Sequence, residues 1–107
     1  MKENILAIVA LHPEKFILKE NSSDQSPEFI KTVSGTRWMS LDILSQDDVD
    51  EILKEVGVEY ELYNGGKLWH WGVWRREAPF SRPASEAIYN TKREALEAAV
   101  EQARKMV

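Results

Sequence analysis

Residues 60–76 of the chain read Tyr-Glu-Leu-Tyr-Asn-Gly-Gly-Lys-Leu-Trp-His-Trp-Gly-Val-Trp-Arg-Arg. Two alternating segments flank the Asn-Gly-Gly sequence at 64–66, a turn that accepts positive φ, and this pattern predicts a β-hairpin. Three of the four tryptophans lie on the second arm, with Arg75 and Arg76 directly after them. The arm is therefore either an unusually aromatic core strand or a surface presented to a partner, and both interpretations stay open.

The second arm carries two sets of side chains on opposite faces of the expected strand. Alternation groups Trp69, Trp71 and Val73 on one face, and Leu68, His70, Gly72 and Trp74 on the other. In one interpretation Trp69 and Trp71 belong to the core and Trp74 partly covers an edge of the sheet. In the other, one aromatic face stays open beside the arginines, where it stacks on bases or holds a peptide.

Two segments have the signals of amphipathic helices. Residues 45–56 begin at Ser45 and residues 91–106 begin at Thr91, and each start has the spacing of a capping box. Apolar side chains then recur at helical spacing, which predicts one buried stripe on each helix. The stripes are Val49, Ile52, Leu53 and Val56 in the first helix, and Leu96, Ala99, Val100 and Ala103 in the second.

Shorter patterns account for the rest of the chain. The apolar run at 5–11 fits a helix or a buried strand, and its composition favours the helix. The other segments are predicted as strands at 15–20, 28–33 and 85–90, with a loop at 21–27. Together the elements predict a single α+β domain over residues 1–107. Its antiparallel sheet of three to five strands carries two main amphipathic helices, 45–56 and 91–106, packed on it.

The net charge of −4 is unevenly distributed. Residues 64–93 hold six basic side chains against two acidic ones, a local balance of +4. The basic residues are Lys67, Arg75, Arg76, Arg82, Lys92 and Arg93. Such clustering is typical of a nucleic-acid contact, but lysine and arginine at solvated strand edges produce it as well.

Composition and spacing argue against several activities. The chain has no cysteine, which excludes disulfides, thiolate catalysis and Cys-based zinc sites and fits a reducing compartment. The only histidines, His12 and His70, are far apart, and the acidic run at 47–51 suits a helix start better than a calcium loop. We therefore expect no catalytic, cofactor-binding or metal-binding residues. The run at 5–11 is too short to cross a membrane, so a cytoplasmic protein is expected.

The second half of the chain resembles known kinds of protein through a Trp-x-Trp pair at 69–71 and a Thr-x-x-Glu-Ala-Leu helix start at 91–96. Residues 58–107 resemble small phage and prophage proteins of the sandwich kind, whose C-terminal hairpin leads into such a helix. They are also similar in element order to the three-strand-plus-helix DNA-binding domain of phage integrases. The first resemblance implies no particular activity. The second implies DNA contact through the sheet face, with a requirement for Arg75, Arg76 and Arg82 there.

A third similarity, to the end of double-stranded-RNA-binding domains, fails on the last helix. Such a domain would place a further lysine where Leu96 stands, and Glu94, Glu97 and Glu101 make this helix acidic. Double-stranded RNA is therefore set aside as a ligand.

These observations predict a small non-enzymatic protein-interaction module, a phage or prophage accessory protein with a protein partner and no cofactor. The aromatic, arginine-flanked strand is of the kind enriched at interface hot spots. Its predicted binding surface consists of Trp74, Arg75, Arg76, Arg82 and Lys67. The alternative is nucleic-acid binding through the strand at 68–76. The sequence carries no signal for the oligomeric state.

Overall fold

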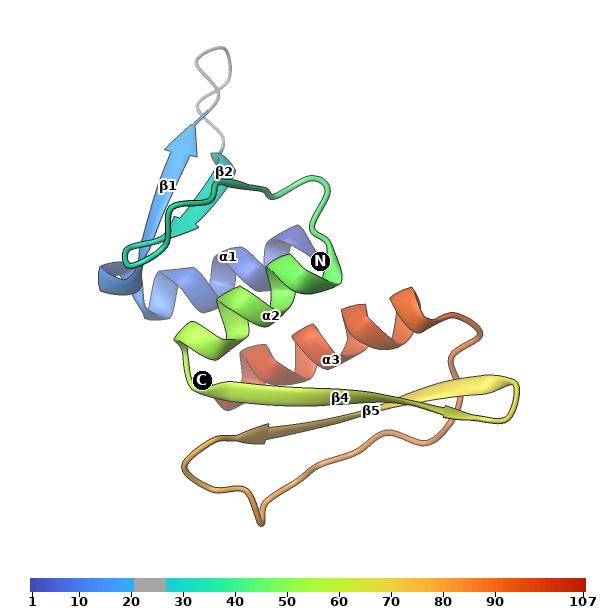
Figure 1. Cartoon of the computed structure of the whole chain (residues 1–107). Coiled ribbons are helices and arrows are strands. Elements are labelled where there is room, and N and C mark those ends of the chain that lie inside the picture. Colours follow the sequence, from blue (N-terminus) through green and yellow to red (C-terminus); the bar gives the residue numbers. More distant parts are fainter. Residues whose placement is uncertain (21–26) are drawn as a thin grey trace.

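The computed structural model describes residues 1–20 and 27–107, so most of the predicted loop at 21–27 lies outside the described residues. It confirms the α+β class (Figure 1). The elements are α1 (Lys2–Leu11), a 3-10 turn (Pro13–Lys15), β1 (Phe16–Glu20), β2 (Pro27–Thr32), β3 (Met39–Ser40), α2 (Gln46–Glu55), β4 (Val58–Gly65), β5 (Leu68–Arg75) and α3 (Lys92–Met106).

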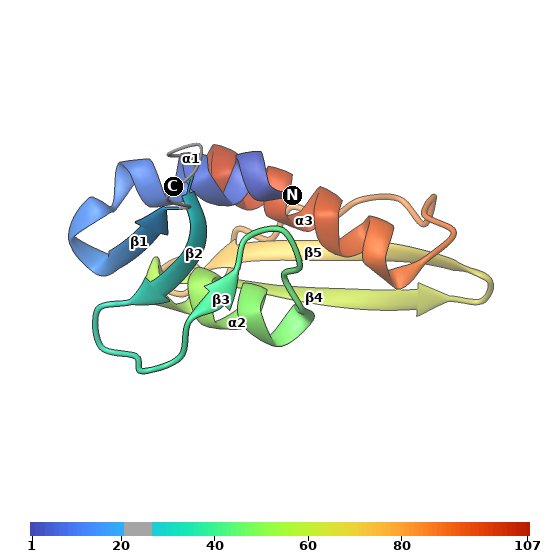
Figure 2. The same cartoon turned by 90° about the horizontal axis from the view of Figure 1, so that it is seen from above.

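The strands form two antiparallel sheets rather than the one that was predicted. The first has the order β1-β2-β3, and the second is the β4–β5 hairpin. The three helices lie between the β1–β2 hairpin and the β4–β5 hairpin (Figure 1). Seen from above, α3 runs along β5 and α2 along β4, in agreement with their contacts (Figure 2).

One hydrophobic core joins the helices to both sheets. The predicted helix stripes are confirmed, except that Val56 lies at the margin and is only partly buried. On the hairpin, Val73 is buried in the core, and Trp71, Tyr60 and Leu62 pack against it. The fully buried side chains come from all parts of the fold and include Ile5, Ile8, Ile30, Met39, Leu41, Val49, Ile52, Leu53, Val58 and Val100.

Local signals explain where the two main helices begin. The capping box of α2 is complete, because Ser45 Oγ accepts from Asp48 N at 3.1 Å and Asp48 Oδ2 accepts from Ser45 N at 3.0 Å. At α3, Thr91 Oγ1 accepts from Glu94 N at 3.1 Å. The reciprocal bond that the sequence predicted there, from the Thr91 backbone to the Glu94 side chain, is not among those formed. The capping box predicted at Thr91 is therefore only half formed.

Two details of the hairpin differ from the sequence prediction. The turn is shifted by one position, since residues 64 and 65 pair in β4 and the two-residue loop consists of Gly66 and Lys67. Gly66 has a φ of 89°, which a side chain would strain. The predicted strand at 85–90 is not continuous. The chain there touches the free edge of β5 through isolated bridges, Gly72 with Ala84 and Trp69 with Tyr89.

Candidate functional site

Trp74, the central residue of the predicted binding surface, is covered rather than presented. Its side chain is only 7% exposed. The indole Nε1 donates to Glu59 Oε2 at 3.0 Å, and the guanidinium of Arg82 lies over the ring, 4.3 Å from its centroid. In this conformation Trp74 has almost no ring surface left for a partner.

Elsewhere on this outer face the side chains contact one another, although Tyr63 remains 42% exposed. His70 stacks on Tyr63 with a centroid distance of 4.8 Å, and a methyl group added at Gly72 would touch the Tyr63 ring at 3.6 Å. On the inner face Trp71 packs against the core, while Trp69 is half-buried with the Lys92 ammonium 5.7 Å from its ring centroid. The structure thus favours the interpretation of the hairpin tryptophans as packing residues.

The arginines at the end of β5 and directly after it contact the ends of two helices. Arg75 Nε donates to the carbonyl of Met106 in the last turn of α3 at 2.8 Å. Arg76 donates to the carbonyl of Lys54 in the last turn of α2 at 3.1 Å. Terminal helix carbonyls carry partial negative charge and lack partners within the helix, so cationic side chains stabilise them. Both arginine side chains nevertheless remain about half exposed, at 48% and 51%.

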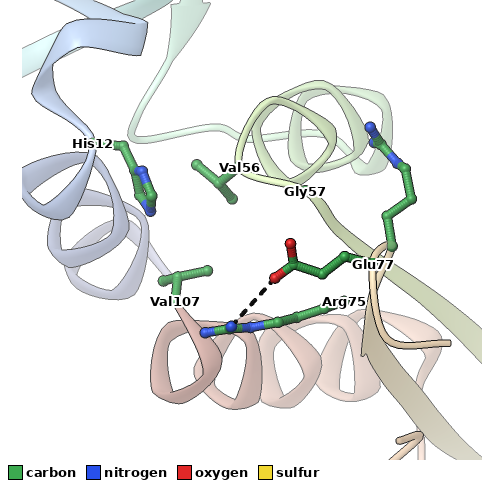
Figure 3. A pocket seen from close by; sticks show the side chains of 7 residues that line it. His12, Val56, Gly57, Arg75, Glu77 and Val107 are labelled. Carbon is green, nitrogen blue, oxygen red and sulfur yellow. Dashed lines mark hydrogen bonds and ion pairs between the residues drawn. The ribbon is translucent and has the colours of Figure 1, made fainter. Parts of the chain in front are cut away.

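A pocket of about 430 Å³ opens beside these arginines (Figure 3). It lies where the C-terminal ends of the helices and of β5 meet, and it is lined by His12, Val56, Gly57, Arg75, Arg76, Glu77 and Val107. Arg75 NH1 lies 3.5 Å from Glu77 Oε1 across it. The pocket therefore combines apolar walls with Arg75, Arg76 and the exposed carboxylate of Glu77. Arg76 Nε also lies 3.7 Å from Glu59 Oε1.

The hydroxyl of Tyr60 links the hairpin to α2. Tyr60 on β4 donates its OH to Asp50 on α2. Burial, and then the hydrogen bond to Asp50, raise the pKa of Tyr60 above its ordinary value. The phenol therefore stays protonated and ties the hairpin to the helix, with no tendency to act as a base near neutral pH.

The structure brings together only part of the predicted surface. Arg75, Arg76 and Arg82 lie at one end of the hairpin, whereas Lys67 lies in the turn at the opposite end of β5. Eight residues of strand span roughly 25 Å, so Lys67 does not share a contact patch with the arginines.

Sequence reasoning missed Phe80, which is fully exposed on the loop after β5. That loop is tight, because Ala78 N donates to Arg75 O at 3.0 Å and Ser81 N donates to Ala78 O at 3.2 Å. The available signal is an aromatic residue between two prolines, Pro79 and Pro83, in a segment without the alternation of a strand or the apolar spacing of a helix. We call Arg75, Arg76, Phe80 and Arg82 the arginine corner.

Comparison with known proteins identifies no relative: no family model, no curated protein and no solved structure matches the chain. Within residues 1–20 and 27–107, no group of three or more His, Cys, Asp or Glu side chains is placed to hold a metal ion. None of the helices in those ranges is long and apolar enough to cross a membrane.

Proposed function

We propose that this protein is a small non-enzymatic protein-interaction module that binds its partner through the arginine corner. The observation that carries the proposal is a fully exposed Phe80 on the short loop that follows two half-exposed arginines, which line a pocket of about 430 Å³. We place the module in the cytoplasm, in keeping with a chain without cysteine. Its resemblance to phage and prophage proteins suggests an accessory role, with a partner encoded by a neighbouring gene.

The chemistry of the corner matches that of protein interfaces. Aromatic residues and arginine are enriched in interface cores and among hot spots. Burying a phenylalanine such as Phe80 contributes about 1.5–3 kcal/mol, which is lost while the ring is in water. The pocket beside Arg75 and Arg76 would accept an acidic side chain with an apolar stem. The expected partner surface therefore offers an apolar hollow for Phe80 next to a carboxylate for the arginines.

The alternative, nucleic-acid binding through residues 68–76, has less support. The ring of Trp74 is covered by Arg82, so no base can stack on it without displacing that side chain. Glu59 and Glu61 pair with the outer-face positions of β5, which places carboxylates where phosphates would lie. A mobility-shift assay with duplex DNA at about 50 mM salt decides this alternative, since absence of a shift at micromolar protein rejects it.

Quantitative pull-down with paired variants tests the protein-binding proposal. The test variant is Phe80→Glu, and the matched control is Ile43→Glu, which adds the same charge at another highly exposed apolar position outside the corner. The expected result is a partner retained by wild type and Ile43→Glu and lost with Phe80→Glu. If every retained protein is indifferent to Phe80→Glu, the arginine corner is not the binding surface.

A further inference from the structure

The β1-β2-β3 sheet has one buried and one open face. Phe16, Ile30, Thr32 and Met39 are buried against the core. The alternate positions of β1 and β2 point away from it, and strand register pairs Ile17 with Lys31 and Lys19 with Phe29 there. Trp38, just before β3, completes this side. We call Ile17, Lys19, Phe29, Lys31 and Trp38 the lysine face.

Trp38 is the most open tryptophan of the chain and lies between two lysines. It is 42% exposed. The ammonium groups of Lys31 and Lys19 lie 5.6 Å and 6.0 Å from the centroid of its ring. Because both lysines are on the outer face of the sheet, the indole lies on that face too. Ile17, which pairs with Lys31, adds an exposed apolar side chain to it.

The backbone that carries Trp38 is anchored on both sides. Arg37 NH1 lies 2.5 Å from Asp48 Oδ1 and Arg37 NH2 lies 2.9 Å from Glu51 Oε2, so the loop is tied to α2. On the other side Met39 is buried in the core. The position of Trp38 on the sheet face is therefore fixed by the anchoring of Arg37 and Met39, and its own side chain stays partly exposed.

We propose that the lysine face binds single-stranded nucleic acid, with a base stacked on Trp38 and the flanking phosphates against Lys19 and Lys31. This is a second surface with a different partner from the one assigned to the arginine corner. An aromatic ring on an open sheet with cations beside it is the arrangement that binds single strands without reading their sequence. The two lysines would move from the ring to the phosphates as the base enters.

Charge and residue type favour a nucleic acid over a protein on this face. Lysine is depleted at protein interfaces, where arginine and aromatic residues are enriched, whereas it is a common phosphate contact. The ion pairs within the described residues do not involve Lys19 or Lys31. Two cations flanking one exposed aromatic ring complement the charge and shape of a phosphate–base–phosphate unit.

The test is a fluorescence-anisotropy titration of a labelled oligothymidylate at about 50 mM salt, with dissociation expected between about 10⁻⁶ and 10⁻⁴ M. The variant Trp38→Ala should weaken binding by a factor of about 5 to 100, as loss of one stacked base does. The double variant Lys19→Ala/Lys31→Ala should reduce the slope of log K against log salt by about 1.4. The control Lys67→Ala/Lys105→Ala removes two exposed lysines elsewhere and should leave that slope unchanged.

Three results would overturn the inference, provided that circular dichroism shows each variant to be folded. The first is no anisotropy change at protein concentrations on the order of 10⁻⁴ M. The second is binding that the Lys67→Ala/Lys105→Ala control loses and the lysine-face variants keep. The third is binding of a labelled poly-glutamate peptide that Trp38→Ala abolishes, with no binding of the oligonucleotide, which would make the face a protein site. None of these results bears on Phe80 and the arginine corner.

Discussion

The β4–β5 hairpin and the β1-β2-β3 sheet use tryptophan in opposite ways. The hairpin holds three of the four tryptophans, yet Trp74 at its end is 7% exposed. The smaller sheet is associated with a single tryptophan, Trp38, which is 42% exposed. The richest aromatic segment of the chain is thus largely a packing element, and the isolated tryptophan is the accessible one.

The difference follows from what covers each sheet. The hairpin packs one face on α2 and α3, and the chain after β5 returns along its free edge and places Arg82 over Trp74. On the outer face of the β1-β2-β3 sheet, Ile17 and Trp38 remain 41% and 42% exposed. Aromatic density in a sequence therefore predicts how much surface must be buried, and exposure depends on which segments return to cover it.

The largest expected effect tests this comparison directly. Trp74→Ala should destabilise the fold by about 3 kcal/mol, because it removes a large buried side chain. Trp38→Ala should cost less than about 1 kcal/mol, since nearly half of its surface is already in water. Urea unfolding of the two variants measures both. Equal losses of unfolding free energy would show that Trp74 and Trp38 contribute alike to the stability of the fold.

The ion pair between Arg37 and Asp48 should restrain the loop that carries Trp38. Asp48→Asn should lower the free energy of unfolding by about 1.5 kcal/mol near neutral pH. Asp48 takes part in the capping box of α2 and forms an ion pair with Arg37. The same change should raise the mobility of the loop that carries Trp38. Urea unfolding measures the loss of stability, and NMR relaxation of the indole N–H of Trp38, which is resolved from those of the other three tryptophans, measures the mobility. Asp47→Asn is the matched control, an exposed carboxylate in the same helical turn.

The stabilisation by Asp48 should depend on pH in a defined direction. Burial raises the pKa of Asp48, but hydrogen bonds from Ser45 and Arg37 outweigh burial, and the pKa ends below its ordinary value. A lowered folded-state pKa gives stability that is complete above the ordinary aspartate pKa of about 4 and is lost as pH falls through the folded value. The stability difference between wild type and Asp48→Asn should therefore shrink below about pH 4. A constant difference down to pH 2 would show that the charge contributes nothing.

Much of the fold could be predicted because its signals are local. Ser45 and Thr91 mark helix starts within four residues of themselves, and alternation marks β5 without any knowledge of its neighbours. β3 could not be predicted, because Met39 and Ser40 form a strand only through pairing with β2. The division into two sheets has the same cause, since strand partners are set by packing rather than by propensity.

The predicted site was less accessible to sequence reasoning. Arg75 and Arg76 bond to carbonyls 31 and 22 positions away in the chain, a role that no spacing rule indicates. The charge pattern of the sequence groups Lys67 with these arginines, although the length of β5 separates them in space. Phe80 and Trp38 are exposed because no other segment that the structure describes packs over them, and only the folded structure shows this.

The third prediction concerns the anchor at the end of the segment that covers the hairpin. Thr91→Ala should cost about 1 kcal/mol and lower the melting temperature by about 4–8 °C, because Glu94 N loses its acceptor at the start of α3. Thermal unfolding measures the shift. Thr36→Ala is the suitable control, because Thr36 is exposed whereas Thr32 is buried and would itself leave a cavity. Equal melting temperatures for the two variants would show that the Thr91 cap does not stabilise α3.

The smallest expected effect on stability concerns the contact of Arg82 with the ring of Trp74. Arg82→Ala should cost about 0.5 kcal/mol, the value of an exposed cation–π contact, yet it should open the ring of Trp74 to solvent. In a Trp38→Phe background, acrylamide quenching of tryptophan fluorescence should therefore increase while the unfolding midpoint moves only slightly. Lys67→Ala, at the other end of the hairpin, should change neither quantity. If quenching stays unchanged in Arg82→Ala, other groups cover Trp74, and the contrast with Trp38 does not depend on this arginine.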